Sequence, residues 1–539
     1  MKLIASGAYL QGEFSTEIGL IPPSFLPIGN KRLYEYQVKF LRNNGSYNDD
    51  IYLSIPESYE LNEFDWISLN KLKVNVIFVP DELELGASIL YCWNVAGNTS
   101  DKLTLLHGDT LFFNFYFESK DAVSTHPNRG FYKRAKLEYE SNKFKSLHDE
   151  WSNDSELVLS GFFNFETPIY FMKSLVEAGN DFTEAIVSYN RKHKVELIDC
   201  GEWLDFGHIN SFYHARSKMT TQRAFNNLEI NKHSVVKTSI SNPKKIFAEG
   251  LWFAELPLEL RVYTPALLKI FEGNGDYSDA LYKLEYLYLL PLSDLMVFGN
   301  LSRGSWVSIF KSINNTIADF GKYKPNYNEA CKINNDDLYL SKTLRRLNDF
   351  EAQSGFDISG YKFALLHDNE FYSLKEIAIN SALNIRKLKN TDTSIIHGDF
   401  CFSNILFDSR AELVKCIDPR GLTPNDELSI YGDSRYDISK IYHSVIGMYD
   451  FIIAGHYKLN VIDKNGVRYF DFEIFSCNDL GCLFRDFILN LSNYSEKEIL
   501  SITIQLFLSM LPLHAEKPML QQAFIANSIR LYHNLEGLN

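Results

Sequence analysis

Two short apolar runs in the last third of the chain each end at an aspartate, and they constrain the fold more than any other feature. One run reads S-I-I-H-G-D and ends at Asp399, and the other reads L-V-K-C-I-D and ends at Asp418. Asn404 lies between them, followed by a third apolar run. Short apolar runs bounded by polar residues are typical of buried strands. The sequence therefore predicts neighbouring strands whose ends hold two carboxylates, with an amide close by.

This combination of side chains suits phosphoryl transfer. In that chemistry one Asp accepts the proton of a hydroxyl group, while an Asn and a second Asp hold Mg²⁺ against the phosphates of a nucleotide. The predicted catalytic base is Asp399, and the predicted metal ligands are Asn404 and Asp418. Because Asp and Asn are also common in turns, H-G-D alone would not support this interpretation, but the three residues together do.

The pattern H-G-D-x-x-x-x-N followed by I-D-P resembles the aminoglycoside phosphotransferase and choline kinase family. In that family H-G-D stands where protein kinases have H-R-D, and I-D-P where they have D-F-G. The run G-D-x-x-Y-D-x-x-K at 432–440 follows as it does in many of these kinases. The resemblance implies a bilobal protein-kinase-like α+β domain, with a small lobe at 218–300 and a large lobe at 301–539. It also implies ATP as co-substrate, Mg²⁺ as cofactor and a small-molecule hydroxyl acceptor.

The predicted small lobe contains a hairpin, with strands at 227–230 and 234–239, followed by a helix. A Lys on a strand and a Glu on the next helix are what a kinase needs to hold the α- and β-phosphates. Lys237 and Glu249 have these positions and are predicted to bind the nucleotide. The hairpin lacks G-x-G-x-x-G, so the sequence does not indicate how the triphosphate is covered. Residues 281–292 are predicted to form the hinge that contacts adenine.

The large lobe is predicted to be mainly helical, because apolar residues recur at helical spacing in segments such as 305–318, 336–350 and 520–531. Another helix is expected after the catalytic stretch. On it, Asp433 and Asp437 are expected to brace the catalytic loop. Lys440 and His443 share one helix face, which could reach an anionic substrate but is expected to be solvated.

The region from Met1 to about Ser217 alternates between strand-like and helical runs. The predicted strands are at 2–5, 50–54, 74–78 and 103–106, and the predicted helix is at 32–44. Such alternation implies a parallel sheet covered by helices, with ligands at the carboxyl ends of the strands. We therefore expect a separate α/β domain at 1–217.

Three motifs in this domain carry a second resemblance. Asp109 ends the run L-L-H-G-D, Asp205 begins D-F-G, and Gly86 begins G-A-S. Together with the early loop P-S-F-L-P-I-G-N-K-R-L, these motifs resemble the sugar-nucleotide pyrophosphorylases, nucleotidylyltransferases that join a sugar 1-phosphate to a nucleoside triphosphate. The resemblance implies a Rossmann-like fold, a Mg²⁺ ion shared by Asp109 and Asp205, and a nucleotide contact at Gly86.

The domain also departs from that family. Its first loop reads S-G-A-Y-L-Q-G, without the Arg of the family's G-x-G-x-R, and Pro23 stands about where the family has a Lys. Those cations stabilise the triphosphate and the developing pyrophosphate. Lys31 or Arg32 would then have to substitute, and Lys31 is the predicted nucleotide contact. A domain that binds a nucleotide sugar without reacting with it is an open alternative.

Composition narrows the remaining function classes. The 539 residues are too many for one ordinary core, and a net charge of −14 argues against a protein that binds nucleic acid through a basic surface. No run approaches the length of a membrane span, and the apolar start is too short for a signal peptide, so a cytoplasmic enzyme is expected. A homo-oligomer is compatible with the sequence.

The sequence as a whole predicts a bifunctional enzyme. Its kinase would phosphorylate a sugar, polyol or amino alcohol, and its nucleotidylyltransferase would activate the product with a second nucleoside triphosphate. The logic of the fusion suggests surface polysaccharide or capsule synthesis. Two alternatives stay open: a choline-type kinase with a cytidylyltransferase domain, and a kinase with a non-catalytic nucleotide-sugar-binding domain.

Overall fold

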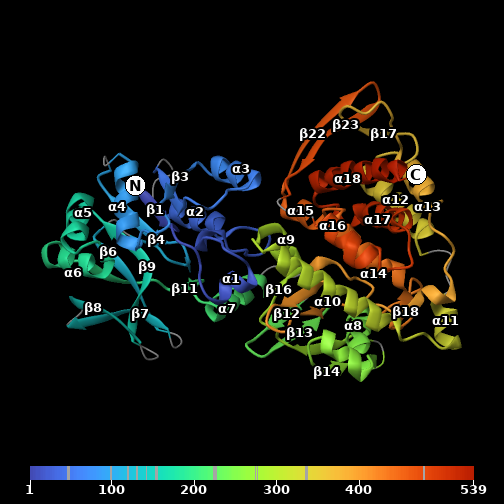
Figure 1. Ribbon diagram of the computed structural model, residues 1–539, viewed down its shortest axis with the longest axis horizontal. Helices are drawn as coiled ribbons and strands as arrows, with labels where there is room; N and C mark the ends of the chain where they lie inside the picture. Colours follow the sequence, from blue (N-terminus) through green and yellow to red (C-terminus); the bar gives the residue numbers. More distant parts are fainter. Residues whose placement is uncertain are drawn as a thin grey trace. The chain divides into compact units, whose positions relative to one another are not determined.

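The chain folds into two compact units, which are described separately below (Figure 1). The first contains Met1–Thr220 and Phe298–Asn300, and the second contains Thr221–Val297 and Leu301–Asn539. The predicted division of the second unit into lobes at residue 300 stays a prediction. The computed structural model describes residues 1–44, 49–97, 100–117, 120–128, 132–140, 143–151, 156–221, 227–273, 275, 277–333, 338–476 and 480–538. Within these ranges, no helix is long and apolar enough to cross a membrane.

A mixed sheet forms the centre of the first unit, with the strand order β10-β6-β9-β4-β1-β2-β3 and the hairpin β7–β8 attached to β9. Its strands are β1 (Lys2–Ala5), β2 (Ile51–Pro56), β3 (Val74–Val79), β4 (Leu103–His107), β6 (Ala122–Pro127), β7 (Lys133–Glu140), β8 (Lys143–Trp151), β9 (Leu157–Phe165) and β10 (Glu196–Asp199). A separate two-stranded ribbon consists of β5 (Thr110–Phe113) and β11 (Glu202–Asp205).

Helices connect and cover these strands, and they confirm the predicted alternation at the start of the chain. They are α1 (Glu13–Glu17), α2 (Leu33–Asn43), α3 (Glu63–Lys71), α4 (Leu85–Val95), α5 (Pro168–Glu177), α6 (Phe182–His193) and α7 (Ile209–Thr221). The buried core includes Leu3, Leu105 and Phe163 from the sheet and Phe171 and Ile186 from the helices.

The predicted parallel sheet is mixed, because β9 and the hairpin strand β8 are antiparallel to their neighbours. β1 pairs in parallel with β2 and β4, as expected, but β9 is antiparallel to both β4 and β6. A parallel partner needs a crossover connection, usually a helix. Between β4 and β9 the described chain forms only strands, so β9 returns in the opposite direction.

The second unit begins with a four-stranded antiparallel sheet, in the order β12-β13-β15-β14, and the helix α8. Its strands and the helix are β12 (Asn227–Ile230), β13 (Ser234–Thr238), β14 (Leu267–Phe271), β15 (Leu281–Glu285) and α8 (Pro243–Glu255). The predicted hairpin and helix are therefore confirmed. The predicted hinge segment contains the end of this sheet and the short strand β16 (Leu290–Pro291).

The rest of the second unit is mainly helical. Its helices are α9 (Leu292–Phe298), α10 (Arg303–Gly321), α11 (Tyr327–Ile333), α12 (Leu340–Ser354), α13 (Leu374–Ala382), α14 (Ser434–Val445), α15 (Tyr449–Ala454), α16 (Gly481–Phe484), α17 (Glu496–Met510) and α18 (Pro518–Gly537). The predicted helix at 336–350 corresponds to α12, and its residues 336 and 337 lie outside the described ranges.

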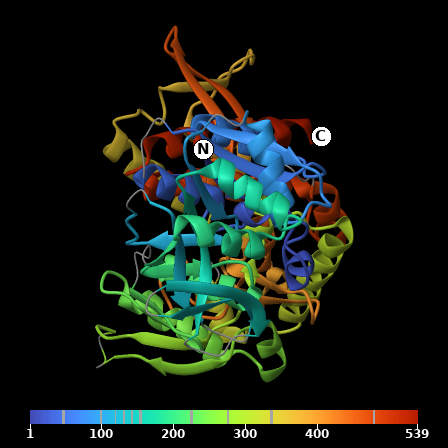
Figure 2. The same ribbon diagram turned by 90° about the vertical axis from the view of Figure 1, so that its left-hand side faces the viewer.

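Small sheets are inserted among these helices. The hairpin of β22 (Tyr457–Lys464) and β23 (Val467–Ile474), which pairs with β17 (Lys362–Leu365), projects from the unit in both views (Figures 1 and 2). Two other sheets carry the catalytic stretch: β18 (Thr393–Ile395) pairs with β21 (Tyr431–Asp433), whereas β19 (Ile405–Asp408) lies between β16 and β20 (Leu413–Cys416). The expectation that the strands before Asp399 and Asp418 are neighbours in one sheet is therefore wrong.

A buried ion pair is part of the core of the first unit. The guanidinium of Arg32 lies 3.0 Å from the carboxylate of Asp65, and both side chains are almost fully buried. Arg32 also donates to the carbonyl oxygens of Phe25 and Phe298, at 2.8 and 2.6 Å. Because all of these partners belong to the first unit itself, Arg32 has a structural role.

We predict that Asp65→Ala destabilises the first unit by about 3–5 kcal/mol, because it leaves the buried charge of Arg32 without its counter-ion. The adjacent Lys31 pairs with Glu35 at the surface, so Lys31→Ala should cost less than about 1 kcal/mol. Urea unfolding followed by amide hydrogen exchange in β1–β3 measures both changes. Equal effects of the two substitutions would contradict the structural role of Arg32.

Candidate functional site

In the second unit, a lysine joins two carboxylates from distant parts of the chain. The Nζ atom of Lys237, on β13, lies 2.7 Å from Glu249 on α8 and 3.1 Å from Asp418 after β20. Tyr282 also donates its hydroxyl to Glu249, at 2.8 Å. Burial lowers the pKa of Lys237, but the two carboxylates outweigh it and raise that pKa, so the ammonium stays charged. Lys237 and Glu249, the predicted nucleotide-binding pair, are thus in contact, and Asp418, a predicted metal ligand, contacts the same lysine.

A glycine lets the chain after Asp418 pack against α8. Gly421 has φ 63°, in the left-handed region, and a Cβ atom there would lie 2.1 Å from the carbonyl oxygen of Ala248. No other residue fits so close to the helix backbone without displacing it. Since Ala248 precedes Glu249, this contact fixes the helix at the position where its carboxylate meets Lys237.

A second cluster surrounds Asp399. Its carboxylate lies 2.8 Å from the Nζ atom of Lys440 and accepts a hydrogen bond from the Nδ2 atom of Asn404 at 3.1 Å. Burial opposes ionisation, but Lys440 outweighs it and lowers the pKa of Asp399 to about 2. The expectation that Lys440 lies on a solvated face is wrong, because its side chain is only 14% exposed and points at the carboxylate.

The loop that carries Asp399 is held by helix α14. The carboxylate of Asp437 accepts the backbone N–H groups of His397 and Gly398, at 2.7 and 2.8 Å, which is the bracing role expected for it. Lys440 follows on the same helix at i+3, so one helix face supplies both the brace and the cation. Burial raises the pKa of Asp437 to about 7.

A histidine connects this loop with the strand before Asp418, although the two strands belong to different sheets. Burial lowers the pKa of His397 to about 4, so its ring is neutral at neutral pH. Its Nε2 atom lies 2.9 Å from the carbonyl oxygen of Ile417 and donates to it. The N–H of Ile417 in turn donates to the carbonyl of Asn404, at 3.0 Å. These contacts hold the base and both predicted metal ligands in one region.

The donor set of Asn404 and Asp418 fits Mg²⁺. Both supply the hard oxygen atoms that this ion prefers, and Mg²⁺ usually takes few protein ligands and completes its shell with water and phosphate oxygens. Accordingly, the described residues contain no group of three or more His, Cys, Asp or Glu side chains arranged to hold a metal ion by themselves.

In the first unit, the two predicted metal ligands also meet. A Cβ atom at Gly207 would lie 2.2 Å from the Oδ2 atom of Asp109 and 3.4 Å from the Oδ1 atom of Asp205, so both carboxylates converge on this glycine. The ribbon β5–β11 brings them together, because Thr110 and Asp205 are paired in its register. Burial raises the pKa of Asp109.

An arginine that the sequence analysis did not identify occupies this site. Arg134, on β7, pairs with Asp205 and lies over the ring of Trp203, 4.8 Å from its centroid. The imidazole of His208 also approaches Asp205, at 3.4 Å. Burial opposes the charge of Asp205, but these two partners lower its pKa to about 2. The carboxylate oxygens suit Mg²⁺, but a shared ion would have to displace Arg134.

A cavity of about 420 Å³ lies beside this arginine. Gly86, His107 and Arg134 are among the residues that line it. A Cβ atom at Gly86 would lie 2.0 Å from the carbonyl oxygen of Asn180, so the glycine brings the start of α4 to the wall of the cavity. Lys31 is not among the described residues of this lining, and its exposed ammonium lies 3.2 Å from Glu35.

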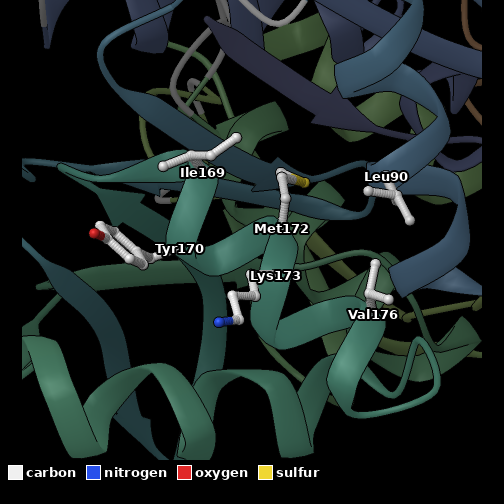
Figure 3. Close-up of a pocket in the computed structure, with 6 residues that line it drawn as sticks. All are labelled: Leu90, Ile169, Tyr170, Met172, Lys173 and Val176. Carbon is white, nitrogen blue, oxygen red and sulfur yellow. The ribbon is translucent and has the colours of Figure 1, made fainter.

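A shallow hollow between α4 and α5 has a different character (Figure 3). It has a volume of about 410 Å³, and its lining is mostly apolar: Leu90, Ile169, Tyr170, Met172, Lys173 and Val176. Lys173, the cation among the described lining residues, pairs with Glu177 at 3.6 Å. These side chains offer no acid–base or metal chemistry, so we place the candidate site of the first unit at Asp109, Asp205 and Gly86.

A scan against models of protein families gave no match, and a search of curated proteins gave none. Among solved structures, the nucleoside-diphosphate-sugar pyrophosphorylase from Vibrio cholerae RC9 is 15% identical, with a TM-score of 0.34, over 40% of this chain and 99% of that chain. The inositol-1-phosphate CTP transferase from T. maritima is 19% identical, with a TM-score of 0.32, over 41% and 96%. UTP-bound UGPase from Acinetobacter baumannii is 16% identical, with a TM-score of 0.32, over 41% and 93%. At these values, the likeness carries no conclusion about function.

We predict that Asp437→Ala loosens the loop that carries Asp399. The substitution leaves two buried N–H groups without an acceptor, at about 1–3 kcal/mol each. Amide hydrogen exchange at His397 and Gly398 should become faster. Asp437→Asn keeps one acceptor oxygen and should have a smaller effect. Unchanged exchange in the alanine variant would show that Asp437 does not hold the loop.

Proposed function

We propose that the second unit is an ATP-dependent phosphotransferase that acts on a hydroxyl group of a small molecule. The observation that carries this proposal is the double contact of Lys237 with Glu249 and Asp418, in the same unit as the Asp399 cluster. Lys237 is positioned to bind α- and β-phosphate oxygens, and Glu249 orients it. Asn404 and Asp418 would hold Mg²⁺, which neutralises negative charge on the phosphates.

Asp399 and Lys440 would act on the acceptor hydroxyl and on the transferred phosphate. Asp399 accepts a hydrogen bond from the acceptor hydroxyl, orients its oxygen toward the γ-phosphate and receives its proton. Because Lys440 outweighs burial and lowers the pKa of Asp399, the carboxylate is ionised and can accept this hydrogen bond, and its main contribution is to orient the hydroxyl group. Lys440 keeps the carboxylate ionised and places a positive charge beside the transferred group.

For the first unit, we propose nucleotidylyl transfer to a sugar phosphate. The convergence of Asp109 and Asp205 next to a cavity lined by Gly86 supports this proposal, and Lys31 stays a predicted nucleotide contact. The bifunctional enzyme would phosphorylate a sugar, polyol or amino alcohol and activate the product for surface polysaccharide or capsule synthesis, as the logic of the fusion suggests. The pairing of Arg134 with Asp205 favours the second candidate, a domain that binds a nucleotide sugar without reacting with it.

We predict that Asp399→Asn lowers turnover by about 10²–10⁴-fold while ATP affinity stays close to that of the wild type. Asp418→Ala should lower both affinity and turnover, and Asn404→Ala should lower turnover more than affinity, because both residues would hold Mg²⁺. ADP release and ATP titration at fixed Mg²⁺ measure these effects. Asp349→Asn, an exposed substitution on α12, is the control. Wild-type turnover of Asp399→Asn would remove the assigned base.

We predict that the full chain with Asp399→Asn still releases pyrophosphate from a nucleoside triphosphate and a sugar 1-phosphate. Adding Asp109→Ala should reduce this release by about a hundredfold or more, through loss of metal binding. Arg134→Gln should tighten Mn²⁺ binding, because it frees Asp205. Nucleotide-sugar binding without pyrophosphate release, across a panel of the common nucleoside triphosphates, would instead establish the binding domain.

A further inference from the structure

Three cationic side chains gather around one tyrosine of the second unit, and a fourth lies close to one of them. The Nζ atoms of Lys342 and Lys440 lie 5.9 and 6.0 Å from the ring centroid of Tyr436, and the Cζ atom of Arg420 lies 5.9 Å from it. Arg346 follows Lys342 by one turn of α12 and adds its charge to the group. The cluster therefore combines α12, α14 and the segment after Asp418.

Among the residues that the structure describes, most of this positive charge has no counter-ion. Lys440 pairs with Asp399, but within the described part of the chain no carboxylate pairs with Lys342, Arg346 or Arg420. All four side chains are partly buried, in a chain whose net charge is −14. Grouping like charges without a partner costs stability, so such an arrangement is typical of a site that binds an opposite charge.

The titration behaviour of the cluster agrees with an excess of positive charge. Tyr436 raises the pKa of Lys342, but burial and the neighbouring cations, mainly Arg420 and Lys440, outweigh it and lower that pKa. Conversely, burial raises the pKa of Tyr436, but Lys342, Lys440 and Arg420 lower it overall. An anion bound here would relieve this repulsion.

We propose that Lys342, Arg346 and Arg420 bind an anionic group, a phosphate or a carboxylate, on the hydroxyl acceptor. The inference rests on the proposed phosphotransferase function and specifies its substrate class. Lys440 connects the base with the cluster, because its Nζ atom lies 2.8 Å from the carboxylate of Asp399 and 6.0 Å from the ring centroid of Tyr436. We therefore expect an acceptor whose hydroxyl group lies at Asp399 to place its anionic group at the cluster.

The backbone holds the cluster close to the base. The N–H of Arg420 donates to the carbonyl of His397, at 2.9 Å, and a Cβ atom at Gly398 would lie 2.7 Å from the Cβ atom of Arg420. Gly398 has φ 77°, so a side chain there would also strain the loop. Arg420 is thus fixed beside the residue that precedes Asp399, and the nucleotide has its own cation in Lys237.

The cluster also selects against one acceptor class. An amino alcohol such as choline carries a positive charge, which these side chains would repel. The anion site therefore counts against a choline-type kinase and favours an acceptor that already carries a phosphate or a carboxylate. The reaction that supplies this acceptor must leave a free hydroxyl on an anionic molecule.

The first test is binding of inorganic phosphate to the full chain saturated with Mg²⁺ and the non-hydrolysable analogue AMP-PNP, which fills the nucleotide site. Calorimetry should show saturable phosphate binding, weakened about tenfold or more by Arg420→Gln and by Lys342→Gln, because each substitution removes a charge-assisted contact. Arg345→Gln is the matched control, because Arg345 lies on the same helix with an exposed side chain. Absence of phosphate binding, or equal weakening by the control, would overturn the anion site.

The second test measures ADP release with matched pairs of acceptors, such as glucose and glucose 6-phosphate, glycerol and glycerol 3-phosphate, and glycerate and choline. Only anionic members should support turnover, and Arg420→Gln should raise the KM for the acceptor while leaving the KM for ATP unchanged. Turnover of choline or a neutral acceptor that is insensitive to Arg420→Gln would overturn the anion site and leave the phosphotransferase intact. Failure of AMP-PNP to bind would instead contradict the phosphotransferase itself.

Discussion

The hydrogen bonds from the amides of His397 and Gly398 to Asp437 are the constraint on which the second site depends. They fix the loop that presents Asp399 against α14, and the same helix then brings Lys440 to that carboxylate. The neutral ring of His397 in turn donates to the carbonyl of Ile417 and so holds the segment before Asp418. A short series of hydrogen bonds therefore holds Asp399, Asn404 and Asp418 together. The strands before the two aspartates belong to different sheets, and not to one sheet as the strand pattern suggested.

The local part of this organisation could be predicted from the sequence. Strands and helices follow from the period of apolar residues, so β1 to β4, α2, the hairpin β12–β13 and α8 were identifiable. The sequence also predicted an amide close to the two carboxylates, and the Nδ2 atom of Asn404 does donate to Asp399. The roles proposed for these residues stay predictions until they are measured.

The non-local part could not be predicted in the same way. The direction of β9 depends on pairing with strands far along the chain, and a strand pattern reads the same in either direction. Helical spacing placed Lys440 on a face of α14, but not the carboxylate that the face meets. Arg134 stands 71 residues from its partner Asp205, and no motif marks it. In each case the deciding contact joins segments that neither periodicity nor spacing relates.

The contribution of Phe298–Asn300 to the first unit has a consequence for the gene that encodes it. The carbonyl of Phe298 accepts a hydrogen bond from the buried Arg32, and Asn300 forms a bridge with Gly19. A gene fragment that stops before the second unit would encode an Arg32 without one of its acceptors. The first unit is therefore built from two separate stretches of the gene, and a boundary drawn at the end of α7 would leave part of its buried polar network on the other side.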